Sequence, residues 1–192
     1  MSGTASNPNE SAASQRTIRW DAVAAIIATL VGLLALVVAG YTAYIQRQQV
    51  SAQVWPFLML ADSDNSSEYM WLNKGVGPAL VKSVQVFVDG KPQHNWNATL
   101  RSMRLEKLDC GQSTLNRDVL SAGEKLDWLQ FKRHQDFQTF RETAFRARLG
   151  FKVCYCSTLG DCWMNDSTGA SWNNRQAVGQ CPKVPDSEQF DD

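Results

Sequence analysis

The feature that most constrains this chain is an uncharged, mainly apolar run of 24 residues from Ala22 to Ile45. As a helix with a rise of about 1.5 Å per residue it is roughly 36 Å long, which exceeds the ~30 Å hydrocarbon core of a bilayer. In lipid every backbone N–H and C=O must find its partner within the chain, so a single span has to be helical. The sequence therefore predicts one transmembrane helix over 20–45, surrounded by the lipid bilayer.

We expect this run to be a retained anchor rather than a cleaved signal peptide. The apolar core of a signal peptide is about 7–15 residues long and ends at small residues, whereas this run is longer and ends in Tyr44 and Ile45. Arg16 and Arg19 precede it, and only Arg47 follows it closely. The positive-inside rule then predicts a cytoplasmic N-terminus and a periplasmic or extracellular C-terminal domain.

Small residues form a ridge along the predicted helix at spacings of four and eight. They are Ala24, Ala28, Gly32 and Gly40. Such a ridge lets two membrane helices approach closely, which predicts pairing with another membrane protein or with a second copy. The alternative interpretation is that Ala and Gly are simply common in membrane helices. The run contains no ionisable residue, which argues against an ion path or proton relay through it.

The rest of the sequence divides by composition. Residues 1–19 lack apolar periodicity, which predicts a disordered tail, and the polar stretch 46–54 predicts a helical stalk. Residues 55–165 have the size of one domain and are predicted to be β-rich, whereas the polar stretch 166–192 predicts a largely irregular tail. Lys plus Arg and Asp plus Glu balance at 19 each, so the charge gives no reason to expect nucleic acid as a partner.

Apolar and polar side chains alternate over several short segments of the domain. Val84, Val86 and Val88 share one face of such a segment, and the Asp89-Gly90 pair after it is a strong hairpin signal. Strands are predicted at 57–61, 69–73, 83–88, 113–120, 124–131 and 149–155, and short helices within 97–108 and 135–143. The predicted fold is therefore mainly β: a β-sandwich, with an immunoglobulin-like form as one option and one or two short helices, preceded by one N-terminal transmembrane α-helix.

Two motifs mark the domain. One is N-x-G-x-G-P-A over Asn73–Ala79, followed by a β-branched strand, and the other is the CYCS…CW hairpin that begins at Cys154. They resemble segments of uncharacterised bacterial single-pass membrane proteins and, more generally, of immunoglobulin-like sandwiches. The resemblance covers Trp55–Lys91 and the CYCS…CW segment, and it implies a β-rich ectodomain. Because that family has no established activity, the resemblance implies no functional residue.

Five cysteines follow the apolar run: Cys110, Cys154, Cys156, Cys162 and Cys181. Cys154 and Cys156 lie on one face of a predicted strand, and the hairpin returns Cys162 to within disulfide reach. We expect one bridge between Cys156 and Cys162 and a second from Cys181 to Cys154 or Cys110, in an oxidising compartment. The alternatives are buried reduced thiols, a zinc site formed by the last four cysteines and thiol redox catalysis. The spacing favours neither of the last two, because it contains no paired C-x2–4-C and no C-x-x-C.

Catalytic signals are weak throughout the sequence. His94 and His134 have no partner at motif spacing, and there is no G-x-S-x-G, P-loop or H-E-x-x-H. We therefore predict no catalytic residue, no cofactor and no metal, and a non-catalytic binding or scaffolding role within an envelope complex. The alternatives are a membrane-tethered thiol oxidoreductase or hydrolase, and a cytosol-facing accessory subunit of a membrane complex.

Overall fold

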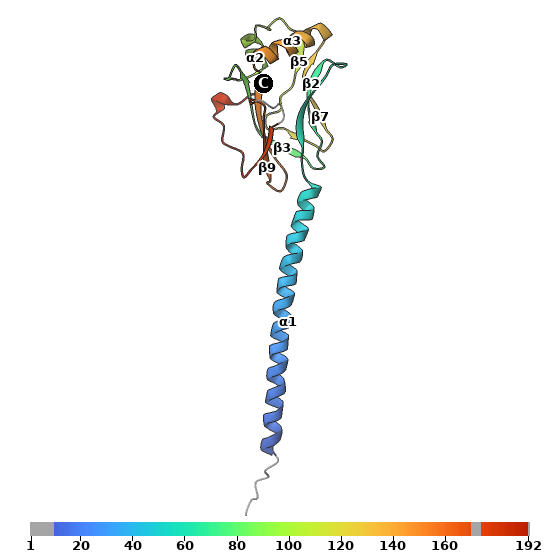
Figure 1. Cartoon of the computed structure of the whole chain (residues 1–192), viewed down its shortest axis with the longest axis vertical. Coiled ribbons are helices and arrows are strands. Elements are labelled where there is room, and N and C mark those ends of the chain that lie inside the picture. The colour runs from blue at the N-terminus through green and yellow to red at the C-terminus, as the bar shows by residue number, and fades with distance from the viewer. Residues whose placement is uncertain (1–9, 170–173, 192) are drawn as a thin grey trace, which may run out of the picture. The chain divides into compact units, whose positions relative to one another are not determined.

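The computed structural model describes residues 10–169 and 174–191 (Figure 1). The chain forms two compact units, Met1–Val50 and Ser51–Asp192. Each unit is described by itself.

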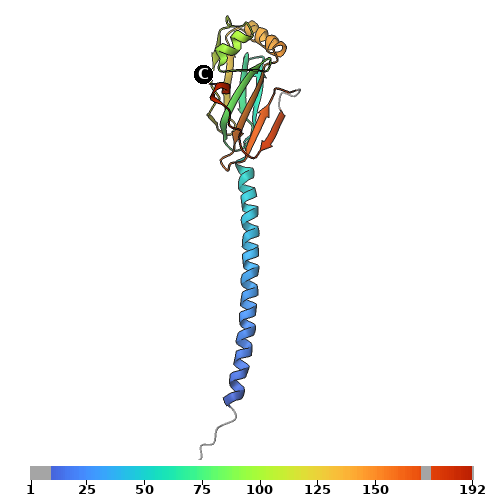
Figure 2. The ribbon, with the colours of Figure 1, turned by 90° about the vertical axis from the view of Figure 1, so that its left-hand side faces the viewer.

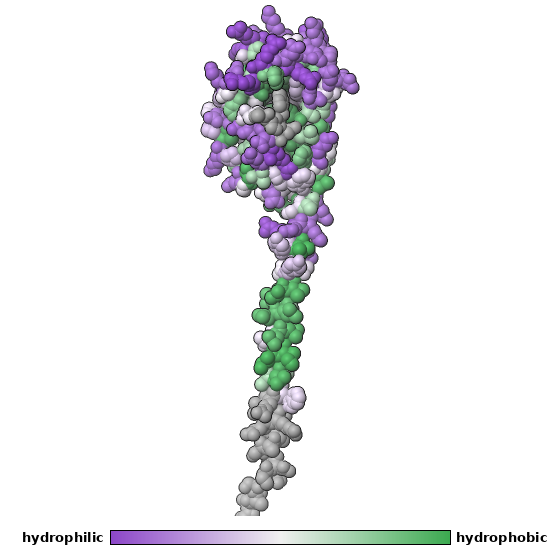
Figure 3. All heavy atoms as spheres, in the orientation of Figure 1, coloured by the Kyte–Doolittle hydropathy of each residue, from purple (hydrophilic) through white to green (hydrophobic). Residues whose placement is uncertain are grey.

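The described part of the first unit is helical and belongs to one long helix, α1 (Glu10–Gln53), whose last three residues fall in the second unit. Its large apolar side chains between Trp20 and Tyr44 are exposed, from 48% at Val23 to 74% at Leu36, and they give the helix a continuous hydrophobic surface (Figure 3). The stretch Trp20–Gln53 is long and apolar enough to cross a membrane, a test that a signal sequence near an N-terminus also passes.

The bounds of α1 correct one expectation and match another. Residues 10–19 were expected to belong to a disordered tail, but they are helical, while 1–9 lie outside the described residues. Ser, Ala, Gln and Glu are compatible with a helix once a strong helix lies directly after them, because adding residues to an existing helix is far easier than starting one. The polar stretch after Ile45 continues the helix to Gln53, as the absence of a breaker predicted.

The second unit contains two antiparallel sheets that face each other (Figures 1 and 2). In the first sheet the order of strands is β1 (Leu58–Ser63), β2 (Glu68–Asn73), β7 (Lys125–Phe131) and β5 (Cys110–Gln112). In the second sheet the order is β10 (Asn174–Val178), β9 (Cys162–Asp166), β8 (Gly150–Cys156), β3 (Ala79–Val88) and β4 (Lys91–Gln93), and β6 (Val119–Leu120) also pairs with β3.

Two α-helices and one 3-10 helix complete the domain: α2 (Trp96–Ser102), α3 (His134–Arg146) and η1 (Asp186–Glu188). The side chain of Asn95 caps α2 by accepting a hydrogen bond from the backbone N–H of Ala98, a role for which asparagine is well suited. In α3 the apolar residues Phe137, Phe140 and Ala144 recur at helical spacing and are buried.

The core between the sheets is built around aromatic rings. Trp71 from β2 and Trp128 from β7 pack edge-to-face against Phe151 from β8, with ring centroids 5.1 and 6.2 Å from that of Phe151. Trp96 from α2 lies 4.7 Å from Trp128, and Phe190 from the C-terminal segment lies 5.2 Å from Trp96. Edge-to-face pairs of this kind add to the stability that burial alone supplies.

The structure confirms a sandwich-like domain after a long apolar helix, but the fold is mixed helix and strand rather than mainly β. The immunoglobulin-like form stays a prediction. The strand expected at 113–120 is reduced to Val119–Leu120, and the short β5 was not predicted. The segment 166–192, expected to be largely irregular, contains β10 and η1. Two long-range interactions of this segment are not apparent from its polar composition. They are the disulfide of Cys181 with Cys154 and the burial of Phe190 in the core.

Candidate functional site

The most elaborate local structure in the domain surrounds Val54–Leu58, the segment that follows α1. We call it the junction segment. Pro56 ends the helix because a proline disfavours helical backbone at the residue before it. The segment then enters β1, and two separate parts of the domain hold it, one on each side.

On one side the junction segment is held by the loop Lys74–Pro78, the glycine loop. The backbone N–H of Lys74 donates to the carbonyl of Phe57 at 2.8 Å, and that of Val76 donates to the carbonyl of Trp55 at 3.0 Å. The two backbones lie so close that a Cβ atom at Gly75 would overlap the backbone of Trp55–Phe57. A Cβ atom at Gly77 would overlap the backbone of Val54. Both positions therefore require glycine for lack of space.

Asn73 connects the junction segment to the glycine loop. Its side chain is buried, and its Oδ1 accepts from the backbone N–H groups of Phe57 at 3.1 Å and Gly75 at 3.0 Å. Its Nδ2 lies within hydrogen-bond distance of three carbonyls, those of Gly77, Leu120 and Ser121, at 2.8–3.1 Å. The motif N-x-G-x-G therefore serves to fasten the chain where it leaves the helix.

On the other side the junction segment is held by the second sheet. The backbone N–H of Leu58 donates to the hydroxyl of Tyr155 on β8 at 3.3 Å. The carbonyl of Leu58 accepts from Nδ2 of Asn165 on β9 at 2.7 Å. Burial raises the pKa of Tyr155, although nearby Arg175 and the hydrogen bond from Leu58 act in the opposite direction. The phenol is therefore neutral at physiological pH.

Arg175 of β10 adds a charged contact on the same side. Its guanidinium carbon lies 4.8 Å from the ring centroid of Trp55 and 4.9 Å from those of Phe57 and Trp163. Among the described residues its Nε atom is buried without a hydrogen-bond partner, so the faces of three rings supply much of the environment of this charge. Because β1 and β10 are edge strands of the two sheets, this contact also covers one open side of the sandwich.

The cysteines lie in the second sheet and in the C-terminal segment. Disulfides join Cys154 to Cys181 and Cys156 to Cys162, and Cys110 is free. Cys156 and Cys162 are directly opposite each other in the register of β8 and β9. The pairing is the one expected from the hairpin, and it assigns Cys154 rather than Cys110 as the partner of Cys181.

Cys110 has the wrong environment for a nucleophilic thiol. Its pKa is raised mainly by burial, with further contributions from Asp109 and Asp136, while a hydrogen bond from Gln112 acts in the opposite direction. Reactive cysteines need a lowered pKa, because the thiolate is the attacking species. The free thiol therefore gives no support to redox catalysis.

The side chain of His134 contacts the hydroxyl group of Ser67. Nδ1 of His134 lies 3.1 Å from Oγ of Ser67, and Nε2 lies 3.2 Å from Nε2 of Gln138. The same Gln138 nitrogen donates to Asp64 at 3.0 Å. Ser67, His134 and Gln138 thus form a short chain of polar contacts between the start of α3 and the turn before β2. The other histidine, His94, contributes only its carbonyl, which accepts from the backbone N–H of Asp191 at 2.8 Å.

The small residues of α1 are exposed. Ala24, Ala28, Gly32 and Gly40 lie on the helix surface, and a Cβ atom added at either glycine would meet no other atom within 4 Å. Pairing of α1 through this ridge stays a prediction.

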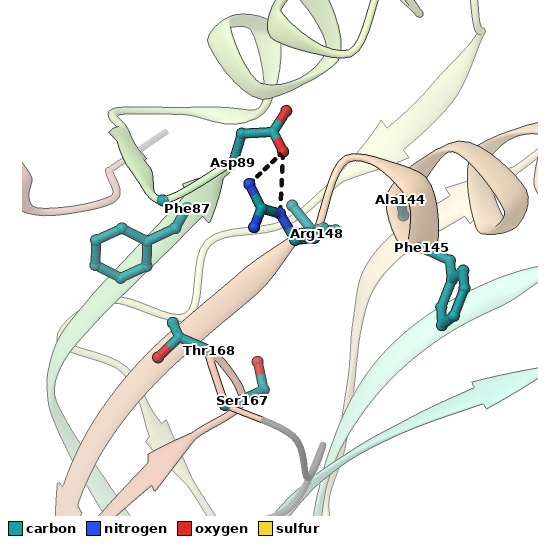
Figure 4. Close-up of a pocket in the computed structure, with 10 residues that line it drawn as sticks. Phe87, Asp89, Ala144, Phe145, Arg148, Ser167 and Thr168 are labelled. Carbon is teal, nitrogen blue, oxygen red and sulfur yellow. Dashed lines mark hydrogen bonds and ion pairs between the residues drawn. The ribbon is translucent and has the colours of Figure 1, made fainter.

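At the opposite end of β3 from the glycine loop is an open cavity of about 380 Å³, the far-end cavity (Figure 4). It lies between the end of α3, the Asp89-Gly90 turn and the end of β9. Arg148 pairs with Asp89 at 3.3 Å beside it, and Phe145, 76% exposed, stands at its edge. Aromatic and arginine side chains at a surface hollow are typical of protein-binding sites.

Sequence reasoning identified some of these residues and missed others. Asn73, Gly75 and Gly77 stand out through their motif, and the cysteines through their hairpin. Tyr155, Asn165 and Arg175 carry no local signal, because what matters is their proximity to a segment about a hundred residues earlier. No family model, curated protein or solved structure matches the chain.

Proposed function

We propose that the chain is a single-pass membrane-anchored protein with a non-catalytic binding or scaffolding domain outside the cytoplasm, in an envelope complex. The observation that carries this proposal is that an exposed apolar helix ends at Gln53 and the junction segment follows directly. From Val54 onward this segment is hydrogen-bonded to the domain. A domain that holds its own chain so close to an anchor is built to work near the bilayer.

The short connection limits where the domain can act. Eight residues lie between Ile45, the last of the apolar run, and Val54, so the two are nine helical rises apart. In helical form they span roughly 14 Å. A partner reached over that distance is the membrane surface, a second copy, or another membrane protein. The last two agree with the predicted pairing through the ridge of small residues on α1.

Two further observations favour the oxidising side and a binding role. Disulfides persist in secreted and periplasmic proteins and are rare in the cytosol, and the domain carries two of them. The exposed Phe145 beside Arg148 and the far-end cavity is the kind of aromatic and basic surface that protein partners contact. The cysteines considered for a thiol enzyme, Cys154, Cys156 and Cys162, are in disulfides, and the raised pKa of the free thiol of Cys110 gives that alternative no support.

A topology experiment on the full-length chain tests the anchor and its orientation. A C-terminal reporter active only outside the cytoplasm is compared with one active only inside it, and membranes are washed with alkaline carbonate before fractionation. The proposal expects activity of the outside reporter alone and retention in the membrane pellet. Exchanging Arg16 and Arg19 for Gln should weaken this orientation, whereas Arg104→Gln, far from the span, should not.

The other outcomes decide among the alternatives. Activity of the inside reporter alone would favour a cytosol-facing accessory subunit. Release of a shortened, soluble domain would show that the apolar run is a signal peptide. Alkylation before and after reduction supplies an independent measure: the proposal expects only Cys110 to react in the unreduced chain.

The binding role is tested at the far end. Photo-crosslinking from position 145 in intact membranes should trap a membrane-associated protein or a second copy, and Arg148→Glu should reduce the yield. A crosslinker at Leu159, also exposed but at the turn between β8 and β9, is the matched control. Equal yields from the two positions would contradict a binding surface at Phe145.

A further inference from the structure

The two disulfides lie side by side and form one cluster of four sulfur atoms, the cysteine cluster (Cys154, Cys156, Cys162 and Cys181). Sγ of Cys156 lies 3.7 Å from Sγ of Cys181, although these two are not bonded to each other. The sulfurs of Cys156, Cys162 and Cys181 all lie within 4.8 Å of one another. Cys154 adds the fourth sulfur, one covalent bond away from that of Cys181.

This spacing is close to that of a tetrahedral metal centre. Zinc binds thiolate sulfur at about 2.3 Å, so two sulfurs on one zinc ion are roughly 3.8 Å apart. The distance between Cys156 and Cys181 already has this value. When both disulfides are opened, the two bonded pairs must separate, and the sulfur of Cys154, which lies outside the group of three within 4.8 Å, must move towards that group. Strands β8 and β9 keep their backbones in place.

The charges around the cluster suit a negatively charged centre. Three of its cysteines line an open groove in which, among the residues that the structure describes, Lys82 and Lys183 are the charged lining residues. A zinc ion with four thiolates carries a net charge of −2, and cationic side chains in the lining of the same groove are compatible with such a charge. The glutamine amides in the lining, Gln180 and Gln189, are also able to donate hydrogen bonds to thiolate sulfur.

We propose that the cysteine cluster, when reduced, binds one Zn²⁺ through the sulfurs of all four cysteines. Two molecules of an external dithiol become disulfides and supply four electrons and four protons, which convert the two protein disulfides to four thiols. Zn²⁺ then displaces four protons from these thiols. Two molecules of an external disulfide then accept four electrons from the four thiolates and four protons from solvent and become dithiols, which restores the two protein disulfides and releases the metal ion. The site thus has two crosslinked forms, and both hold the C-terminal segment onto the second sheet.

The test uses the full-length chain in detergent micelles. The protein is reduced with a dithiol, freed of reductant without oxygen, and titrated with Co²⁺ as a spectroscopic probe for zinc. The expected result is saturation at one ion per chain, with sulfur-to-cobalt charge-transfer bands and tetrahedral d–d bands that Zn²⁺ removes. The unreduced chain should show none of these bands.

Variants assign the ligands. Even residues outside the coordination shell change metal affinity by about 10–100-fold, so Cys181→Ser should weaken Co²⁺ binding at least about tenfold. Cys110→Ser is the matched control and should leave binding unchanged. In case Cys181→Ser does not fold, alkylation of the wild-type chain reads out the same site: Zn²⁺ should protect four cysteines and leave Cys110 reactive.

Three results would overturn the proposal. They are no metal retained by the reduced, folded chain, Co²⁺ affinity unchanged in Cys181→Ser, or loss of binding in Cys110→Ser. The proposal does not depend on the compartment of the domain. A cytosol-facing domain would be isolated with zinc and an outward-facing one with disulfides, so a failure of the metal site and a failure of the proposed orientation give different results.

Discussion

The two ends of β3 are built on different principles. At its beginning, the glycine loop and the junction segment lie in backbone contact, and Asn73 satisfies groups on both. At its end, the Asp89-Gly90 turn faces an open cavity, and a Cβ atom at Gly90 would meet nothing within 4 Å. At the closed end, neutral hydrogen bonds connect the glycine loop to the junction segment. At the open end, the contacts include ion pairs such as that of Arg148 with Asp89.

This difference indicates which end tolerates change. Close backbone contact leaves no room for a side chain and no water to replace a lost hydrogen bond, so substitutions there are costly. Exposed ion pairs contribute little, because solvent screens them. We infer that the closed end secures the fold next to the helix and that the open end is free to vary with its partner.

The largest effect is expected at Gly77. In Gly77→Ala the new Cβ overlaps the backbone of Val54, so the loop must move, and the free energy of unfolding should fall by about 3 kcal/mol or more. Gly169→Ala, at the far-end cavity with open space around it, should change it by less than about 0.5 kcal/mol. Thermal unfolding monitored by circular dichroism measures both. Equal losses would contradict the comparison.

Asn73→Ala should have the next largest effect. It removes the partner of two partly buried backbone N–H groups and of three carbonyls. We expect a loss of about 2–3 kcal/mol, since a buried polar group left without a partner costs about 1–3 kcal/mol. Hydrogen exchange should quicken at Phe57 and Gly75 in particular. Asn95→Ala removes only a helix cap and should cost about 1 kcal/mol, which makes it the matched comparison.

Arg175→Met should have a moderate effect that reports on the cation–π contact. Three rings surround the guanidinium, and such contacts are worth about 0.5–2 kcal/mol. Met keeps much of the side-chain volume, so the loss should be about 1 kcal/mol and accompanied by altered fluorescence of Trp55 and Trp163. If stability is retained and the fluorescence is unchanged, the charge plays no part in holding the junction segment.

The ion pair of Glu68 with Lys125 should make stability depend on pH, which the hydrogen bonds of Asn73 should not. Burial raises the pKa of Glu68, but hydrogen bonds from Lys125 and Ser66 outweigh it, and the pKa lies below its ordinary value of 4.5. A carboxyl whose folded-state pKa is lowered stabilises the fold above its unfolded pKa and loses that contribution as the pH falls through the folded value. Glu68→Gln should therefore flatten the loss of stability below pH 4.5. Asn73→Ala should leave the slope unchanged, because its hydrogen bonds do not titrate.

The smallest effect is expected for Arg148→Ala. The side chain is 79% exposed and its partner Asp89 is 55% exposed, so the free energy of unfolding should change by about 0.5 kcal/mol or less. The same substitution should nevertheless reduce crosslinking from position 145. A large loss of stability would mean that the far end is structural after all.

Local patterns predicted much of the fold and part of the site. Alternation placed the strands around Val84 and Val153, and helical spacing placed α3, because the faces of single elements repeat along the chain. Alternation failed near Val119, where only two residues pair with β3, because pairing requires a free neighbouring edge that no local pattern records.

The sequence by itself determined the long apolar helix, the alternating strands, and the glycines and Asn of the N-x-G-x-G motif. Each of these follows from interactions between residues close together along the chain. Only the tertiary structure decided that the side chains of Tyr155, Asn165 and Arg175 contact the junction segment. It also decided that Cys154 rather than Cys110 bonds to Cys181, and that Phe190 is buried in the core. The physical reason is that these contacts depend on how two sheets stack, and stacking brings together residues that share no periodicity.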